Sequence, residues 1–295
     1  MLLLTGGTGL VGSALLRRLT AAGRPVRCLV RDPRRLGTQR VRVQIALGDL
    51  TDPPSFRNAL RGVDTVIHLA ASIRDQPEGS IEELDGIATW RMVEAAERQG
   101  VERFVFFSAL GASTHHRTRC LRAKALAEQA VREADLHSIV FAPSIVYAPG
   151  DPWLTLLERM ALLPVMPLSG RGRALYQPIW AEDVAECVAA SLDNDDGNGS
   201  RHRRYELAGP ETLSHEQIVR TVLEALGRSR PLLHVPTPVV SRSLRLLEAA
   251  VGPSAFATWD EAELMEVSMV SERGTADVQG LGVSPHAMSA VLEAA

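Results

Sequence analysis

The sequence predicts an α/β fold, a doubly wound parallel sheet with a small C-terminal lobe. Two observations lead to this class. Short apolar runs alternate with helical patterns up to about residue 143, which is typical of parallel strands joined by right-handed crossovers. A loop with glycines at positions 6, 9 and 12 also joins the first apolar run to the first helical pattern.

The alternating elements follow one another closely. The apolar runs that we expect to form buried strands are residues 2–4, 25–30, 41–47, 64–70, 104–107 and 138–142. Apolar residues at helical spacing predict helices over residues 13–22, 53–60, 82–99 and 120–134. Gly23 and Gly100 are placed to end the first and third of these helices, and Asp52 or Thr51 to cap the second.

After Pro143 the alternation breaks. We expect helices over residues 150–160 and 182–192, an extended piece at 178–180, a surface loop at 193–204 and a strand at 205–208. Ser214 is placed to cap a helix that runs to residue 226. A further helix buries a face made of Val240, Leu244, Leu247 and Val251. We therefore expect a first domain over residues 1–213 and a small, mostly helical lobe over 214–295.

The glycine loop predicts a dinucleotide site. Gly6 allows a sharp turn after the strand, Gly9 lets backbone N–H groups approach a pyrophosphate, and Gly12 lets the helix pack closely. The helix N-terminus then offers unpaired donors and a positive dipole end to the phosphates. Thr8, Leu10 and Val11 complete the expected cradle.

Bulk properties exclude other classes. The chain has 295 residues, of which 45% are hydrophobic, and a net charge of −3, which argues against nucleic-acid binding. Its three cysteines are far apart, without metal-ligand spacing, which favours a reducing compartment. No apolar run approaches the length of a membrane span. We expect a cytoplasmic protein.

The end of the second strand indicates which dinucleotide binds. An acid there binds the ribose hydroxyls of NAD, whereas an arginine accommodates the 2′-phosphate of NADP. Val30 stands where the acid is expected, followed by Arg31, with Arg34 and Arg35 close behind. Guanidinium groups pair well with phosphate, so the sequence favours NADP(H) over NAD(H), even though Asp32 is near.

Several motifs in order resemble the extended and atypical short-chain dehydrogenases/reductases, a Rossmann-fold family that includes epimerases and dehydratases. They are Thr5-Gly6-Gly7-Thr8-Gly9-Leu10-Val11-Gly12, Gly48-Asp49-Leu50, His68-Leu69-Ala70-Ala71, Pro143-Ser144-Ile145-Val146-Tyr147 and Ala181-Glu182-Asp183-Val184-Ala185. The resemblance covers residues 2–213.

The resemblance implies positions for the cofactor. Asp49 and Leu50 should flank the adenine, and Ala70 and Ala71 should line the cofactor. The run from Pro143 to Ile145 should approach the nicotinamide. Ordinary core packing is the alternative role for the two alanines and for Ile145.

The catalytic motif departs from the family. Its members use a Tyr as proton relay and a Lys four residues later on the same helix, with a Ser or Thr after the fifth strand. Here the relay position is Cys120, and either Ser108 or Ala109 follows the strand. Cys120 is an inert replacement or, as the alternative, a substitute acid.

Lys124 is retained at the motif position. It is the one lysine in the chain, and the other 31 of the 32 lysine and arginine residues are arginine. A compact ammonium suits a site between two ribose hydroxyls better than a planar guanidinium does. Cofactor binding is therefore expected to persist while the usual acid is lost.

Within the family, residues 121–128 and 143–147 most resemble the atypical branch that holds the NADPH-binding accessory subunit of respiratory complex I. This resemblance implies a nucleotide-binding protein with a structural or redox-sensing role. The alternatives are an NADP-dependent oxidoreductase, epimerase or dehydratase acting on a small carbonyl or nucleotide-sugar-like substrate with a non-Tyr acid, or a subunit that docks on a protein partner. The substrate-selecting residues fall in the divergent C-terminal part.

Overall fold

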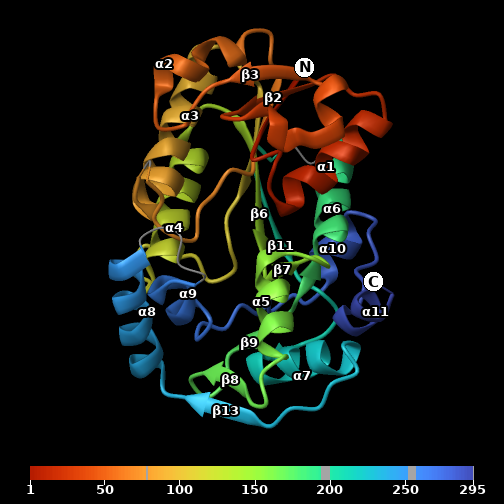
Figure 1. The fold of residues 1–295 in the computed structure, drawn as a ribbon. Helices are drawn as coiled ribbons and strands as arrows, with labels where there is room; N and C mark the ends of the chain where they lie inside the picture. Colours follow the sequence, from red (N-terminus) through yellow and green to blue (C-terminus); the bar gives the residue numbers. More distant parts are fainter. Residues whose placement is uncertain (78, 194–199, 252–256, 295) are drawn as a thin grey trace.

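The computed structural model describes residues 1–77, 79–193, 200–251 and 257–294. Within these residues a seven-stranded sheet has the order β11-β6-β5-β4-β1-β2-β3 (Figure 1), and all its neighbouring strands are parallel. The strands are β1 (Leu2–Thr5), β2 (Val26–Val30), β3 (Gln44–Leu47), β4 (Thr65–His68), β5 (Arg103–Phe107), β6 (His137–Pro143) and β11 (His202–Leu207). The strand order reverses between β1 and β4, which is where dinucleotides bind in such sheets. The predicted doubly wound parallel sheet is confirmed.

Helices cover both faces of this sheet (Figure 1). On one face α1 (Leu10–Ala21) packs against α6 (Ala181–Asp193). The other face carries α2 (Pro53–Phe56), the 3-10 helix η2 (Arg57–Leu60), the π-helical turn η3 (Glu82–Ile87), α3 (Ala88–Arg98) and α4 (Arg119–Glu133).

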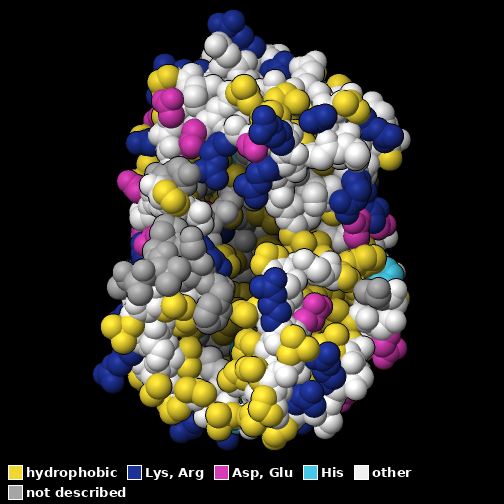
Figure 2. Space-filling model, in the orientation of Figure 1, with side chains coloured by type: hydrophobic (Ala, Val, Ile, Leu, Met, Phe, Trp, Pro, Cys, Tyr) yellow, Lys and Arg dark blue, Asp and Glu magenta, His cyan; other side chains and the backbone are white. Residues whose placement is uncertain are grey.

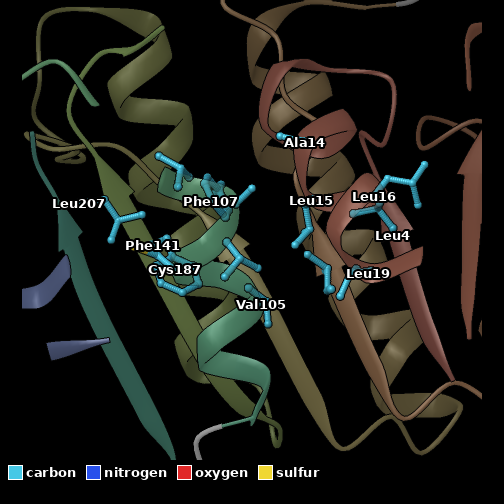
Figure 3. Close-up of a cluster of buried hydrophobic side chains, with 14 of the residues drawn as sticks. Leu4, Ala14, Leu15, Leu16, Leu19, Val105, Phe107, Phe141, Cys187 and Leu207 are labelled. Atoms are coloured by element: carbon cyan, nitrogen blue, oxygen red, sulfur yellow. The ribbon is translucent and has the colours of Figure 1, made fainter. Parts of the chain in front are cut away.

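Successive strand residues face opposite layers, as the period of a β-strand requires. On β5, Phe104 and Phe106 belong to the apolar cluster under α3 and α4, whereas Val105 and Phe107 belong to the cluster under α1 and α6. Figure 3 shows this second cluster, with Leu15 and Leu19 from α1 and Cys187 from α6 among the sheet side chains. Both faces of the sheet are therefore buried over its central strands, such as β1 and β5, which are apolar at most positions, whereas the edge strands β3 and β11 are more exposed.

A second lobe follows the sheet and lies at the lower end in Figure 1. Its elements are α5 (Pro152–Met160), β8 (Met166–Ser169), β9 (Leu175–Tyr176), β12 (Leu213–Ser214), α7 (His215–Ala225), β13 (Leu232–Val235), α8 (Thr237–Val251), α9 (Trp259–Leu264) and α11 (Met288–Glu293). The pair β7 (Val146–Tyr147) and β10 (Ile179–Trp180) connects it to the sheet.

The apolar core of this lobe draws on both sides of residue 213. Leu154, Met166 and Tyr176 pack in one cluster with Ile218 and Val222. In the opposite direction, the segment with α10 (Ala276–Gly280) returns to the sheet, where Val278, Leu281 and Val283 join the cluster under α1 and α6. The division of the chain at residue 213 stays a prediction, and the two cores cross it.

Several boundaries differ from the sequence expectations. Helix α1 begins at Leu10, three residues earlier than expected, so the glycine loop leads directly into it. Residues 41–43 precede β3, because a 3-10 helix η1 (Pro33–Val41) occupies the start of the expected strand. Strand β11 begins at His202 and pairs with β6, so the expected loop is wrong at residues 202–204, and residues 194–199 of it lie outside the described part.

The capping of α7 follows the expectation. The Ser214 hydroxyl accepts a hydrogen bond from the Gln217 nitrogen, and the Gln217 side-chain oxygen accepts one from the Ser214 nitrogen. This reciprocal pair satisfies two donors that the helix itself leaves open.

Candidate cofactor site

The glycine loop lies between the end of β1 and the first turn of α1. Gly6 has a φ of +71°, and a Cβ there would lie 2.5 Å from the backbone nitrogen of Ala70. A Cβ on Gly12 would lie 2.1 Å from the Gly6 carbonyl oxygen. Both positions therefore require glycine, because the chain passes against its own backbone there. The loop therefore has the tight backbone geometry that a pyrophosphate site requires.

The N-terminus of α1 is free to receive an anion. Gly9 is the N-cap residue, no side chain caps this helix, and its first turn contains no acidic residue. Thr8, Leu10 and Val11 are half-buried beside Gly9, which is exposed. The first backbone N–H groups of α1 and the positive end of its dipole suit a phosphate.

The next two strand ends bring basic residues and Asp49 to the same edge. Val30 pairs with Leu47, and the Gly48 nitrogen donates to the Val30 carbonyl at 3.2 Å. Arg31 and Arg35 are exposed just after β2, as is Arg34. The Asp32 carboxylate is engaged as the cap of η1, where it accepts from the Arg34 nitrogen at 2.9 Å.

Asp49 and Leu50 follow β3 and are both half-buried. The Asp49 carboxylate accepts hydrogen bonds from the nitrogen and the hydroxyl of Thr51, at 2.9 and 2.8 Å. Its side chain is thus held in a local turn. The Asp49 backbone is engaged in the same turn, since its nitrogen contacts the Ser55 hydroxyl at 2.8 Å and its carbonyl accepts from the Asp52 nitrogen at 3.1 Å.

Behind the loop a chain of buried polar groups joins β1 to α3. The Thr5 hydroxyl lies 2.9 Å from Nδ1 of His68, whose Nε2 lies 3.1 Å from the Thr89 hydroxyl. Burial, with a smaller effect from Lys124, lowers the pKa of His68 to about 3, so this imidazole is neutral. Ala70, half-buried, and Ala71, exposed, follow directly and form the small-residue floor next to Gly6.

Lys124 projects from α4 into this polar region. Its Nζ donates to the carbonyl oxygen of Phe107 at 3.1 Å and lies 3.7 Å from a carboxylate oxygen of Asp85. Asp85 is 1% exposed, and its other carboxylate oxygen accepts from the Ser72 nitrogen at 2.7 Å. Burial raises the pKa of Asp85, whereas Lys124 lowers it.

Cys120 lies one helical turn before Lys124, on the same side of α4. It is buried and packs with Ile81 and Ala123 in a small apolar cluster. Burial, supported by the negative charge of Asp85, raises the pKa of this thiol to about 11. The thiol of Cys120 is therefore protonated and lies within an apolar contact.

Ser108 is the first residue after β5. Its nitrogen donates to the Phe141 carbonyl at 2.8 Å, and among the described residues its buried hydroxyl has no hydrogen-bond partner. Ala109 is half-buried beside it. An unsatisfied buried hydroxyl is costly unless a ligand or water completes it, so this position suits a bound polar group.

The segment after β6 lies next to this site. The Leu110 nitrogen donates to the Pro143 carbonyl at 3.0 Å, and the Ile179 nitrogen to the Ile145 carbonyl at 3.0 Å. Ser144 between them donates to the Met269 carbonyl at 2.7 Å. Residues 143–145 therefore connect the sheet edge to the second lobe. Figure 2 shows the surface hollowed at about this height, between the part that carries β1 to β3 and the part that carries β8 and β9.

Two charged residues of this region were missed by the sequence reasoning. One is Asp85. The other is Arg119, which directly precedes Cys120 and binds the carboxylates of Asp75 at 2.9 Å, Glu82 at 2.7 Å and Asp260 at 3.2 Å. These partners raise the pKa of Arg119 and join α4 to η3 and to α9.

The parts of the site fit an NAD(P) molecule. The loop of Gly6, Gly9 and Gly12 would hold the pyrophosphate, and Lys124 would contact the nicotinamide ribose. When bound, the nicotinamide supplies hydride chemistry at the carboxyl ends of the strands. Across the described ranges, no helix is both long and apolar enough to cross a membrane. The cytoplasmic location stays a prediction.

Comparisons with known proteins agree with this geometry. A family model described as NAD(P)H-binding matches residues 6–195. The mitochondrial NADH dehydrogenase (ubiquinone) 1 alpha subcomplex subunit 9 of Arabidopsis thaliana is 28% identical over 245 residues, which cover 79% of this chain and 60% of the plant protein. Sterol demethylase protein B of Methylococcus capsulatus is 31% identical over 274 residues, which cover 83% of this chain and 80% of that protein.

Among solved structures, a nucleoside-diphosphate-sugar epimerase from Staphylococcus aureus has a TM-score of 0.78 at 18% identity and covers 99% of both chains. That likeness shows a shared fold. The family model includes the glycine loop and extends through the sheet to α6. The chain therefore belongs to the NAD(P)H-binding family, in agreement with its resemblance to the atypical short-chain dehydrogenases/reductases.

Proposed function

We propose that this protein holds NADP(H) in preference to NAD(H) and lacks the ordinary proton relay of its family, which suits a structural or redox-sensing role. The state of Cys120 carries the proposal. A thiol whose pKa is raised to about 11, packed against Ile81 and Ala123, is a poor proton donor to a substrate oxygen. Lys124, in contrast, is held in place by Phe107 and Asp85.

Support for NADP(H) comes from the end of β2. Arg31 and Arg35 are exposed there, and the nearby carboxylate of Asp32 is already engaged with the Arg34 nitrogen. A guanidinium in this place favours a 2′-phosphate over free ribose hydroxyls.

Substitution of Arg31 should test the cofactor preference. We expect Arg31→Ala to weaken NADPH binding by about 1–3 kcal/mol, because a charge-assisted contact to the 2′-phosphate is lost. NADH binding should barely change, so the preference should largely disappear. Titration calorimetry with both cofactors measures this. Arg61→Ala, an exposed arginine outside the proposed site, serves as the control. Equal affinity of the unsubstituted protein for NADPH and NADH would contradict the proposal.

A second function, reduction of a small carbonyl with a non-Tyr acid, is favoured by one observation. The buried Ser108 hydroxyl has no partner among the described residues, and a substrate oxygen could fill that place. The relative from Methylococcus capsulatus carries a name that points to sterol demethylation, so a carbonyl on an apolar substrate belongs in the test.

Turnover decides between the two functions. The purified protein, loaded with NADPH, is incubated with a panel of carbonyl compounds that includes sterol ketones, and the loss of the reduced nicotinamide absorbance is followed. We expect slow or no oxidation, since general acid catalysis contributes about 10²–10⁴-fold. Cys120→Ser should leave NADPH binding and that low rate unchanged. Fast turnover that collapses in Cys120→Ser would make Cys120 a working acid and overturn the first function.

A further inference from the structure

The second lobe exposes an unusual run of apolar side chains between α5 and β8. Leu162, Leu163 and Val165 are 63%, 48% and 36% exposed, and Pro164 between them is exposed as well. Exposed apolar residues are common singly on protein surfaces. Four in succession, in a connection that includes a proline, form a continuous apolar surface.

The pairing of β8 with β13 enlarges this surface. The two strands are parallel, with Leu232 opposite Met166, so the segments that precede them lie at the same edge. The Met166 nitrogen donates to the Pro231 carbonyl at 2.9 Å. Leu233, on β13, is 55% exposed. We call residues 162–165 together with Pro231 and Leu233 the apolar edge.

Basic residues predominate near the apolar edge, and the carboxylate of Glu216 beside β13 is paired with Arg220 and His234. Although the whole chain has a net charge of −3, residues 159–181 and 225–247 contain no Asp or Glu. Arg159, Arg228 and Arg230 flank the apolar edge in sequence, and none of the three has an ion pair among the described residues. Other arginines do form ion pairs, such as Arg98 with Glu94 and Arg220 with Glu216.

We propose that the apolar edge docks on the surface of an anionic lipid membrane. Residues 162–165 enter the headgroup region, and the three arginines contact lipid phosphates. Interfacial segments combine these two properties, apolar side chains that leave water and cations that meet anionic headgroups. β8 and β13 lie at the lower end of the molecule (Figure 1), where apolar and basic side chains gather together in Figure 2. A protein partner is the less favoured occupant, because the surface lies at one end of the molecule and is flanked in sequence by arginines without an ion pair among the described residues.

Co-sedimentation with lipid vesicles tests the proposal on the full chain. We expect binding to vesicles of phosphatidylcholine mixed with phosphatidylglycerol, weaker binding at high salt, and little binding to phosphatidylcholine alone. Arg228→Gln with Arg230→Gln should weaken the binding roughly thirtyfold. Leu162→Asn with Leu163→Asn should weaken it at least about tenfold, because less apolar surface leaves water.

Matched controls separate docking from misfolding. Arg57→Gln with Arg61→Gln removes two exposed arginines outside the apolar edge and should leave vesicle binding unchanged. All variants should keep their unfolding temperature and their NADPH affinity. The fluorescence of a tryptophan introduced as Leu163→Trp should be quenched by brominated phospholipids. This quenching would show directly that position 163 inserts into the membrane.

Three outcomes would overturn the proposal. The first is no binding to anionic vesicles, or binding that both edge variants retain. The second is equal competition by inorganic phosphate or glycerophosphoglycerol, which would assign the arginines to a free phosphate compound. The third is binding that requires membranes with their native proteins, which would assign the edge to a protein partner. None of these results depends on cofactor choice or turnover.

Discussion

The Asp85→Asn variant should lose about 3–5 kcal/mol of unfolding free energy, because it leaves the buried ammonium of Lys124 without its counter-charge. The pair is enclosed, since the side chain of Lys124 is 9% exposed and that of Asp85 is fully buried. Asparagine has the same shape and can still accept the Ser72 hydrogen bond. The loss of unfolding free energy therefore reports the removal of the negative charge. Urea denaturation measures it.

A double-mutant cycle makes this prediction specific. Lys124→Met should be destabilising for the same reason, whereas the double variant Asp85→Asn with Lys124→Met should recover most of the loss, since no uncompensated charge remains. NADPH binding should fail to recover in the double variant, because Lys124 itself is absent. Glu94→Gln, which breaks an exposed pair with Arg98, should cost at most about 1 kcal/mol. Additive losses in the cycle would show that the two residues do not interact.

Gly12→Ala should weaken NADPH binding roughly a hundredfold and destabilise the fold by about 1–3 kcal/mol. The new methyl group would meet the Gly6 carbonyl oxygen at 2.1 Å and the Gly6 carbonyl carbon at 2.8 Å. Backbone atoms cannot rotate aside as a side chain can, so the loop or α1 must move. Either movement displaces the N–H groups that would face the phosphates of a bound dinucleotide.

Gly280→Ala provides the matched control. A Cβ at Gly280 would have no atom within 4 Å, and this glycine does not have a positive φ. The variant should be neutral or slightly stabilising, because alanine loses less entropy in a helix than glycine. Calorimetric NADPH titrations and thermal unfolding compare the two. Unchanged NADPH affinity in Gly12→Ala would show that the loop does not hold the cofactor.

The turn after β1 and the parallel sheet were predictable from the sequence, because both follow from local rules. Glycines between an apolar run and a helical pattern predict the turn, and the alternating elements predict the parallel sheet. Lys124 also stood out in the sequence as a candidate site residue, because every other basic residue is arginine. In the structure Lys124 and Cys120 lie one turn apart on α4, and Ser108 follows β5, as the motif spacing predicted.

Asp85, the partner of Lys124, was missed because an acidic residue at an apolar position of a helix does not by itself identify the cation that it pairs with. Asp85 occupies a place in the buried stripe of Ile81, Ala88 and Met92, where an apolar residue is expected. A carboxylate in such a stripe implies a buried cation, but the sequence does not say which one. The π-helical turn at Glu82–Ile87 is a second feature that helical periodicity alone does not predict.

The ion pairs of Arg119 could not be predicted from the sequence for a different reason. Its partners Asp75, Glu82 and Asp260 come from three separate segments, the last of them 141 residues away. Only the tertiary fold brings them together. The start of β11 was missed similarly, since the polar residues at 202–204 resemble a loop until their pairing with β6 at the sheet edge is known.

The return of α10 to the sheet has a consequence for the order in which the protein is completed during synthesis. Asp277 accepts a hydrogen bond from the Glu206 nitrogen on β11, and Val278 is fully buried against the first core. The residues that finish the dinucleotide-binding half are thus synthesised after β11, since Asp277 lies 71 residues beyond Glu206. Until they arrive, β11 remains uncovered on a nascent chain, exposed to chaperones and to pairing with other chains.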